Sequence, residues 1–302
     1  MKGYALFLLP LLAAACNSSE ETATTRVAER AARVLEYTPA PGQFINERNA
    51  MSGFAGETTA AEACAYAERR FDEGLYVSLG GWGGYIVAAF DAPVPASAAD
   101  YDLFVISNQM LTSSEPGVVY VARDSDGDGS HAGETWYELR GSEFANSNRR
   151  YAVTYRRPAA DGDPVAWEDN TGRSGEIGRI AEHTQNYFPA WIGGDERTYT
   201  GTLLPDNVDE GEVDDQGRPV TAWIARPFLW GYADNWSSVD RQGTTNRFRI
   251  ADAVTADGAP AGLAEIDFIK IQTGVNLWRT AIGELSTEVV GIGCYRTVVT
   301  VE

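Results

Sequence analysis

The chain has 302 residues, with 24 Lys and Arg against 43 Asp and Glu, which gives a net charge of −19 at pH 7. Nucleic acid and anionic lipid repel a strongly acidic protein, so the composition excludes both as partners. The length fits one β-rich domain of about 200 to 250 residues with additional segments at its ends.

The N-terminus has the pattern of an export signal. Lys2 supplies a positive charge, residues 4–12 are apolar, and residues 13–16 are small and end in a cysteine. About a dozen apolar residues are too few to span a bilayer. The segment resembles a bacterial lipoprotein signal, which implies cleavage after residue 15 and lipidation of Cys16. An ordinary signal peptide is the alternative, because Ala13 stands where leucine is usual.

This signal predicts a lipid-anchored protein outside the cytoplasm, at the outer membrane or the cell surface. Residues 16–40 are expected to form a flexible tether with a short helix, because residues 26–36 carry apolar side chains at helical spacing. Alanine-rich residues 58–71 predict a second helix. Residues 41–302 are expected to form a single domain with an insertion at about residues 205–222.

From Leu75 onward, short runs rich in Val, Ile, Tyr, Phe and Trp alternate with Gly, Pro, Asn and Asp. The runs predict strands at residues 76–79, 85–90, 101–106, 118–122, 136–139, 151–155, 199–203, 248–250, 266–272 and 287–292. The expected fold is therefore all-β, a two-sheet, jelly-roll-like sandwich with a short helical N-terminal preface.

Two cysteines remain besides Cys16. In an oxidising compartment, Cys64 and Cys294 could form a disulfide that joins the two ends of the domain. They could equally stay as free thiols, and their spacing does not suggest a metal site.

An acidic loop at residues 124–134 lies between two predicted strands. Its aspartates occupy alternate positions with glycines between them, a spacing with which carboxylates surround a hard cation. The flanking strands exclude an EF-hand. The alternative is a hairpin that is merely solvated. The predicted ligands of a structural Ca²⁺ are Asp124, Asp126, Asp128, Ser130 and Glu134.

Aromatic side chains gather with amide and carboxylate groups at residues 223–240. Flat rings beside hydrogen-bonding groups are suited to stack on a sugar or another planar ligand. Trp82, which lies between two glycine pairs, could join them. The alternative is that the rings fill the core. The predicted ligand-binding residues are Trp82, Trp230, Tyr232, Asp234, Asn235 and Trp236.

The sequence predicts no catalytic residue. His131 and His183, the two histidines, belong to no Ser-His-Asp arrangement, and HExxH, Walker and Rossmann patterns do not occur. A carboxylate pair for glycoside hydrolysis stays open, for example Glu115 or Glu143 with Asp234, because a sequence does not reveal separation in space.

A series of short motifs follows one order along the chain. They are residues 80–86 (GGWGGYI), 101–105 (YDLFV), 114–121 (SEPGVVYV), 135–143 (TWYELRGSE), 151–155 (YAVTY), 230–235 (WGYADN) and 272–276 (QTGVN). Together they resemble a family of Gram-negative cell-surface lipoproteins, often labelled cell surface or PKD-domain protein and found beside TonB-dependent outer-membrane transporters. The resemblance covers residues 75–291 and implies capture of a scarce nutrient, such as a corrinoid, for a transporter.

The favoured function is therefore a calcium-stabilised, lipid-anchored protein that binds a corrinoid or a glycan-like ligand and assists its uptake. An extracellular enzyme acting on polysaccharide is the first alternative. An adhesion or surface-layer component is the second.

Overall fold

The computed structural model describes residues 22–301 except residues 32 and 217. The expected signal peptide and Cys16 lie outside these residues. The chain divides into two compact units, Met1–Val27 with Thr297–Glu302, and Ala28–Arg296. All sites discussed below belong to the second unit. In the described part of the chain, no helix is long and apolar enough to cross a membrane.

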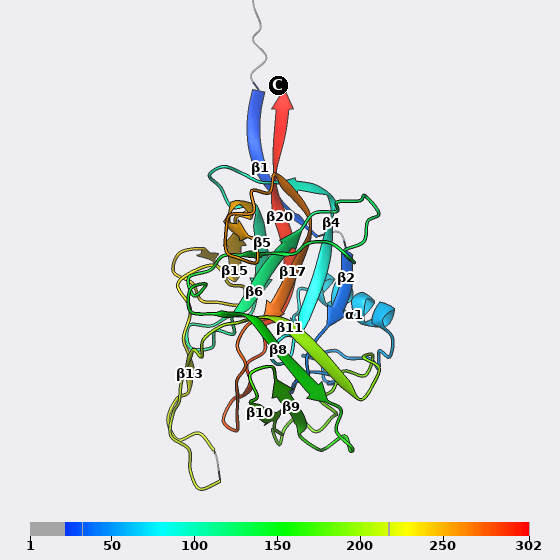
Figure 1. The fold of residues 1–302 in the computed structure, drawn as a ribbon, viewed down its shortest axis with the longest axis vertical. Coiled ribbons are helices and arrows are strands. Elements are labelled where there is room, and N and C mark those ends of the chain that lie inside the picture. Colours follow the sequence, from blue (N-terminus) through cyan, green and yellow to red (C-terminus); the bar gives the residue numbers. More distant parts are fainter. Residues whose placement is uncertain (1–21, 32, 217, 302) are drawn as a thin grey trace, which may run out of the picture. The chain divides into compact units, whose positions relative to one another are not determined.

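The fold is all-β, as expected, and is built around two six-stranded sheets (Figure 1). The first sheet has the order β1-β20-β5-β15-β14, with β3 paired to β20. Its strands are β1 (Thr22–Arg30), β3 (Val77–Ser78), β5 (Leu103–Ser107), β14 (Arg241–Gln242), β15 (Thr245–Phe248) and β20 (Glu288–Val301).

The central sheet has the order β16-β7-β6-β17-β4-β2. Its strands are β2 (Arg33–Thr38), β4 (Tyr85–Pro95), β6 (Gly117–Ala122), β7 (Tyr137–Leu139), β16 (Ala253–Val254) and β17 (Glu265–Thr273). Each strand that the sequence predicted between residues 76 and 292 overlaps an observed strand.

A third sheet, of four strands, was not expected. Its order is β10-β9-β8-β11, and its strands are β8 (Asn148–Arg156), β9 (Val165–Asp169), β10 (Ser174–Ile177) and β11 (Glu196–Leu203). Two small hairpins, β12 (Val208–Asp209) with β13 (Ile224–Ala225) and β18 (Trp278–Arg279) with β19 (Gly283–Glu284), and the 3-10 helix η1 (Ile250–Asp252) complete the fold.

The main core lies between the first and central sheets. Alternate side chains of β4, β6 and β17 pack there against β5 and β20, because successive residues of a strand point to opposite faces. The core residues of these strands include Ile86, Ala88, Leu103, Val105, Val119, Val121, Ile269, Ile271, Val289 and Ile292.

The second predicted helix is confirmed as α1 (Ala60–Asp72). Thr59 caps its N-terminus in a capping box with Glu62. Two arginines lie in its last turn, where their positive charges interact favourably with the negative end of the helix dipole. Ala63, Tyr66 and Ala67 are buried in the main core. The helix covers β2 and the edge of the central sheet.

The first predicted helix, at residues 26–36, is wrong. Residues 26–30 belong to β1 and residues 33–36 to β2, which pairs with β4 along the edge of the central sheet. A bulge between Val34 and Glu36 shifts the register, so the apolar spacing no longer follows the period of two that marks a strand. Pairing of β1 with β20 and of β2 with β4 overrides the helical spacing of the apolar residues.

The third sheet covers the second face of the central sheet through hydrogen bonds between side chains and backbone. The amide nitrogen of Gln272 donates to the carbonyls of Gly83 (2.8 Å) and Thr200 (3.1 Å). The Thr202 backbone N–H donates to the Tyr120 hydroxyl at 3.0 Å. A β-bulge between residues 266 and 268 of β17 turns Phe268 and Lys270 toward this face while Ile269 stays in the main core.

Gly80 should tolerate no side chain without a loss of stability. Its φ is +68°, and an added Cβ would lie 1.9 Å from the Ala40 carbonyl oxygen. We expect Gly80→Ala to lower the free energy of unfolding by a left-handed backbone cost of about 1–2 kcal/mol plus an overpacking cost of about 1–3 kcal/mol. Urea denaturation measures the loss.

Gly74→Ala is the matched control. Gly74 has a φ of +70°, but nothing lies within 4 Å of an added Cβ, so only the backbone cost applies. Equal losses for the two variants would contradict the close approach of Gly80 to Ala40.

Candidate functional site

The acidic loop connects β6 to β7, as predicted, and is held by its own carboxylates. The carboxylate of Asp124 accepts hydrogen bonds from the backbone N–H groups of Gly127 (2.8 Å) and Gly129 (2.9 Å). Both glycines have a positive φ, which folds the backbone around the carboxylate. Glu134 accepts from the backbone and the hydroxyl of Ser125 at 2.9 and 2.7 Å.

Three of the predicted metal ligands come together. Asp124, Asp126 and Glu134 each place one carboxylate oxygen within 4.8 Å of the others. Since calcium binds oxygen at about 2.3–2.6 Å, oxygens on opposite sides of one ion are about 5 Å apart, so one divalent cation fits this group. Asp128 lies outside the group, and its carboxylate accepts from the backbone N–H of Ser130 at 2.7 Å.

The end of the acidic loop forms part of the wall of a cavity. His131 Nε2 is hydrogen-bonded to Glu36 Oε2 at 3.0 Å, and its ring lies 6.4 Å from those of Trp136 and Phe268. The cavity, called the lysine cavity below, has a volume of about 250 Å³. Its lining includes Glu36, Tyr85, His131, Trp136, Arg197, Thr200, Lys270 and Gln272.

The sheet register explains how these side chains meet. Glu36, Val87 and Lys270 are direct partners on β2, β4 and β17. The same row continues from Lys270 to Tyr120 on β6 and to Glu138 on β7. Directly opposed residues share a face, so the row places a lysine between two glutamates on the face that the third sheet covers.

Glu36 is an ionised and fully hydrogen-bonded carboxylate. Burial alone would raise its pKa, but hydrogen bonds from His131, Tyr85 and Thr38 lower the pKa to about 2. The Tyr85 hydroxyl donates at 2.5 Å and the Thr38 hydroxyl at 2.8 Å. The negative charge of Glu36 therefore already has its donors.

Lys270 has no such partners. Its ammonium makes no hydrogen bond or ion pair with any described residue and rests against the rings of Tyr120 (4.3 Å), Trp136 (5.1 Å) and Tyr85 (5.8 Å). Burial lowers the pKa of Lys270 to about 8, although Glu36 acts to raise it. The group stays largely charged at neutral pH.

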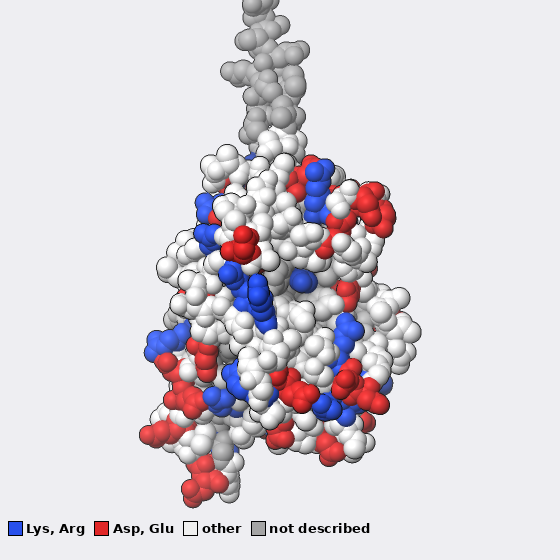
Figure 2. All heavy atoms as spheres, viewed as in Figure 1, with Lys and Arg blue, Asp and Glu red and all other residues white. Residues whose placement is uncertain are grey.

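A second hollow, called the side cavity, adjoins the lysine cavity and shares Trp136 with it. Its volume is about 180 Å³, and its lining includes Tyr120, Trp136, Glu138, Arg149, Arg150 and Thr202. In Figure 2, Lys and Arg side chains gather at the middle of this face, over the part where Figure 1 places β6, β8 and β17. An acidic chain thus has a locally basic surface here.

The aromatic residues of the predicted ligand site differ in their burial. Trp82 and Tyr232 are both fully buried and belong to different core clusters, so neither ring can stack on a ligand. Trp236 is half-buried beneath Arg241, whose guanidinium lies 3.7 Å from the ring centroid. Trp230 is half-buried and lines a separate cavity of about 170 Å³.

Asp234 and Asn235, also predicted to bind a ligand, close a buried turn. Asp234 has a φ of +51°, which aspartate tolerates better than most residues, and its carboxylate accepts from the Glu288 backbone N–H at 2.8 Å. The Asn235 side chain bonds to the backbone of Phe228 in both directions, at 2.8 and 2.9 Å. Both residues stabilise the fold.

Of the carboxylates considered for hydrolysis, Asp234 is buried, and Glu115 and Glu143 are half-buried. Burial, followed by repulsion from Glu288, raises the pKa values of Glu115 and Asp234 well above the usual range. Burial also raises the pKa of Glu288 to about 7 and that of Glu284 to about 8. These groups affect stability at neutral pH and line none of the cavities described here.

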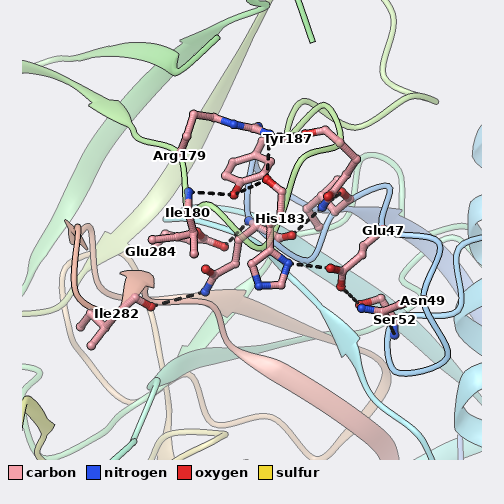
Figure 3. Close-up of polar contacts among 12 residues, drawn as sticks. Glu47, Asn49, Ser52, Arg179, Ile180, His183, Tyr187, Ile282 and Glu284 are labelled. Carbon is pink, nitrogen blue, oxygen red and sulfur yellow. Dashed lines mark hydrogen bonds and ion pairs between the residues drawn. The ribbon is translucent and has the colours of Figure 1, made fainter. Parts of the chain in front are cut away.

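His183 takes part in a structural cluster (Figure 3). Its Nδ1 bonds to Glu47 at 2.6 Å, and the other oxygen of Glu47 accepts from the Ser52 hydroxyl at 2.5 Å. The carboxylate lies between the imidazole and the hydroxyl, so the imidazole cannot take the serine proton as a catalytic triad requires. The cluster joins the loop at residues 43–52 to the segment at residues 179–187.

Cys64 is half-buried and Cys294 is buried, and both are free thiols, so the disulfide that the sequence left open does not form in this structure. Cys16 lies outside the described residues.

Sequence reasoning missed Glu36, Trp136, Arg197 and Lys270. One signal was available, because lysine occurs only at positions 2 and 270 of this chain. A single lysine within the apolar run of β17 indicates that a positive charge lies on a covered face of the sheet. The residues around Lys270 come from other parts of the chain, so its local sequence did not reveal them.

No protein-family model matches the chain, and no curated protein is significantly similar to it. The geometry of the acidic loop and of the two cavities therefore carries the functional interpretation.

Stability should fall as the pH rises through neutrality. A carboxyl group with a raised pKa in the fold keeps a proton that the unfolded chain releases above its ordinary value of 4.5. The resulting stabilisation is complete below that pH and is lost as the pH passes about 7 to 8. We expect Glu284→Gln to raise the Tm at pH 8.5, by about 2 °C or more for each kcal/mol regained, and to change it little at pH 4.5.

Glu182→Gln, at an exposed position, is the control and should leave the difference in Tm between the two pH values unchanged. A Glu284→Gln variant with the wild-type pH dependence would show that this carboxyl is not the group responsible.

Proposed function

We propose that the protein is a lipid-anchored binding protein at the outer membrane or cell surface, which captures a small ligand in the lysine cavity and assists its uptake by an outer-membrane transporter. The observation that carries the proposal is the charged Lys270 without a hydrogen-bond acceptor in an open, aromatic-lined cavity. Concave sites with few polar groups among aromatic side chains are typical of ligand-binding proteins.

The volume of the cavity favours a sugar-sized group. Pockets for drug-sized ligands measure about 300–1,000 Å³, and the lysine cavity measures about 250 Å³. A corrinoid macrocycle is larger than a typical drug, whereas a sugar ring is smaller. A glycan-like ligand therefore fits the site better than a corrinoid does.

Binding is supported better than hydrolysis. Glycosidases hold two carboxyl groups about 5–9.5 Å apart. Glu36 and Glu138, the two carboxylates that line the lysine cavity and the side cavity, lie in one row across four strand intervals. At about 4.8 Å for each interval, the two are roughly 19 Å apart, which is too far for that chemistry.

Calcium in the acidic loop is the second part of the proposal. The carboxylates of Asp124, Asp126 and Glu134 would hold the ion, and the ion would offset their mutual repulsion. Through His131 the same loop reaches Glu36, so a stable loop would also support the wall of the lysine cavity.

Calcium should raise the Tm of the protein, and a chelator should reverse the rise. We expect Asp126→Asn to abolish most of this shift, because it removes one charged ligand while leaving an oxygen for the hydrogen bond from Asp128. Differential scanning fluorimetry with calcium and with chelator measures the effect.

Asp128→Asn is the matched control, since Asp128 lies in the same loop but outside the cluster. It should keep the calcium shift. Identical melting curves with and without chelator in the wild type would remove calcium from the proposal.

A ligand of the lysine cavity should depend on Trp136. We expect a thermal-shift screen against glycans, corrinoids, haem and siderophores to find compounds that raise the Tm of the wild type and fail to raise that of Trp136→Ala. The physical reason is the loss of the aromatic surface that both cavities share.

Trp230→Ala provides the control, because Trp230 is also half-buried but lines a different cavity. A ligand whose binding is lost in Trp230→Ala and kept in Trp136→Ala would place the site in that other cavity. If no compound in the screen raised the Tm of the wild type, the result would count against a binding function.

A further inference from the structure

The lysine cavity contains two cationic groups that lack acceptors. Lys270 makes no hydrogen bond or ion pair with a described residue. Arg197 lines the same cavity, and its Nε is buried without a hydrogen-bond partner. A buried charged donor without an acceptor is unfavourable, so an anion that enters the cavity gains two charge-assisted hydrogen bonds.

The acidic residue in the described wall of this cavity is not free to serve these cations. Glu36, the one acidic residue lining this cavity, already accepts hydrogen bonds from Tyr85, Thr38 and His131. Gln272 Oε1 also lines the cavity and has no partner, but it is a neutral acceptor, so the described wall of the cavity offers Lys270 and Arg197 no free anionic acceptor. A charged ligand can supply one in place of water.

The use of lysine instead of arginine at position 270 supports a role in binding an anion. The chain carries its positive charge on arginine everywhere except at residues 2 and 270. A compact ammonium fits between the rings of Tyr120 and Trp136 and can direct its donors toward a single carboxylate, whereas a guanidinium is a wide planar fork.

The ring of Trp136 adds a surface suited to a sugar. It is half-buried and belongs to the walls of both the lysine cavity and the side cavity. The side cavity offers hydrogen-bonding groups of both kinds, because Glu138 Oε1 and Arg149 Nη1 are buried there without partners. One ring thus adjoins an anion-binding hollow and a mixed polar hollow.

Building on the proposed binding function, we infer that the ligand is an acidic saccharide. The carboxylate of a uronic acid residue binds Lys270 and Arg197 in the lysine cavity, its ring lies against Trp136, and the neighbouring sugar occupies the side cavity. The locally basic surface in Figure 2 attracts such a ligand despite the acidic charge of the whole chain.

The test compares a galacturonate disaccharide with the matching neutral galactose disaccharide by isothermal titration calorimetry, with calcium present throughout. We expect the acidic disaccharide to bind the wild type more tightly. Lys270→Met should weaken its binding about 10-fold to 100-fold, the effect of losing a hydrogen bond between charged groups, and should leave neutral-disaccharide binding unchanged. Arg197→Gln should act in the same direction, and Arg156→Gln, at an exposed site outside both cavities, should have no effect.

Lys270 also provides a direct readout. Because it is the only lysine after residue 2, acetylation by an amine-reactive reagent, followed by peptide mass mapping, reports on this one side chain. The galacturonate disaccharide should protect Lys270 from acetylation, whereas the galactose disaccharide and inorganic phosphate at the same concentration should not.

The outcomes separate this inference from the function on which it rests. Equal binding of both disaccharides, unaffected by Lys270→Met and Arg197→Gln but lost in Trp136→Ala, would overturn the anionic ligand and keep the binding function. If inorganic phosphate protected Lys270 from acetylation and the galacturonate disaccharide did not, the inference of a saccharide ligand would be wrong. If neither disaccharide bound, but another compound stabilised the wild type and not Trp136→Ala, the ligand would not be a saccharide and the proposed binding function would stand.

Discussion

The organisation of this protein depends on a central sheet that is covered on both faces. The first sheet covers one face with an apolar core, and the third sheet covers the other, where several polar side chains lie. Buried polar groups require partners. Gln272 finds backbone carbonyls, Glu138 accepts from Thr202, and Glu36 accepts from three donors. Lys270 has no hydrogen-bond partner among the described residues, and the candidate site is built around it.

The acidic loop and the lysine cavity belong to one structural unit. The loop begins at the end of β6 and returns to β7, both of which contribute to the row of residues that contains Lys270. His131 bonds to Glu36 seven positions along the chain from Asp124. A cation in the loop would thus hold the backbone near the cavity wall without entering the cavity, which is a positioning role.

Local sequence predicted strands well where tertiary pairing agreed with side-chain preference. It failed at residues 26–36, where apolar residues at helical spacing favour a helix but pairing of β1 with β20 and of β2 with β4 decides the conformation of the described residues. Periodicity also failed at residues 266–272, because a bulge reverses which side chains face the core. Bulges and edge pairings depend on the partner strand, which here lies about 50 residues away for β2 and about 180 for β17, so no local pattern encodes them.

The sequence by itself determined the all-β class, the position of α1 and the acidic loop between two strands, because strand preference, capping and carboxylate spacing are local properties. Only the tertiary structure decided which aromatic rings face solvent. Trp82 and Tyr232 are buried, whereas Trp136, next to β7, lines two cavities. Only the sheet register brought Glu36, Lys270 and Glu138 into one row. Burial and cross-strand neighbours are properties of packing between distant segments, and so is the lack of an acceptor for Lys270.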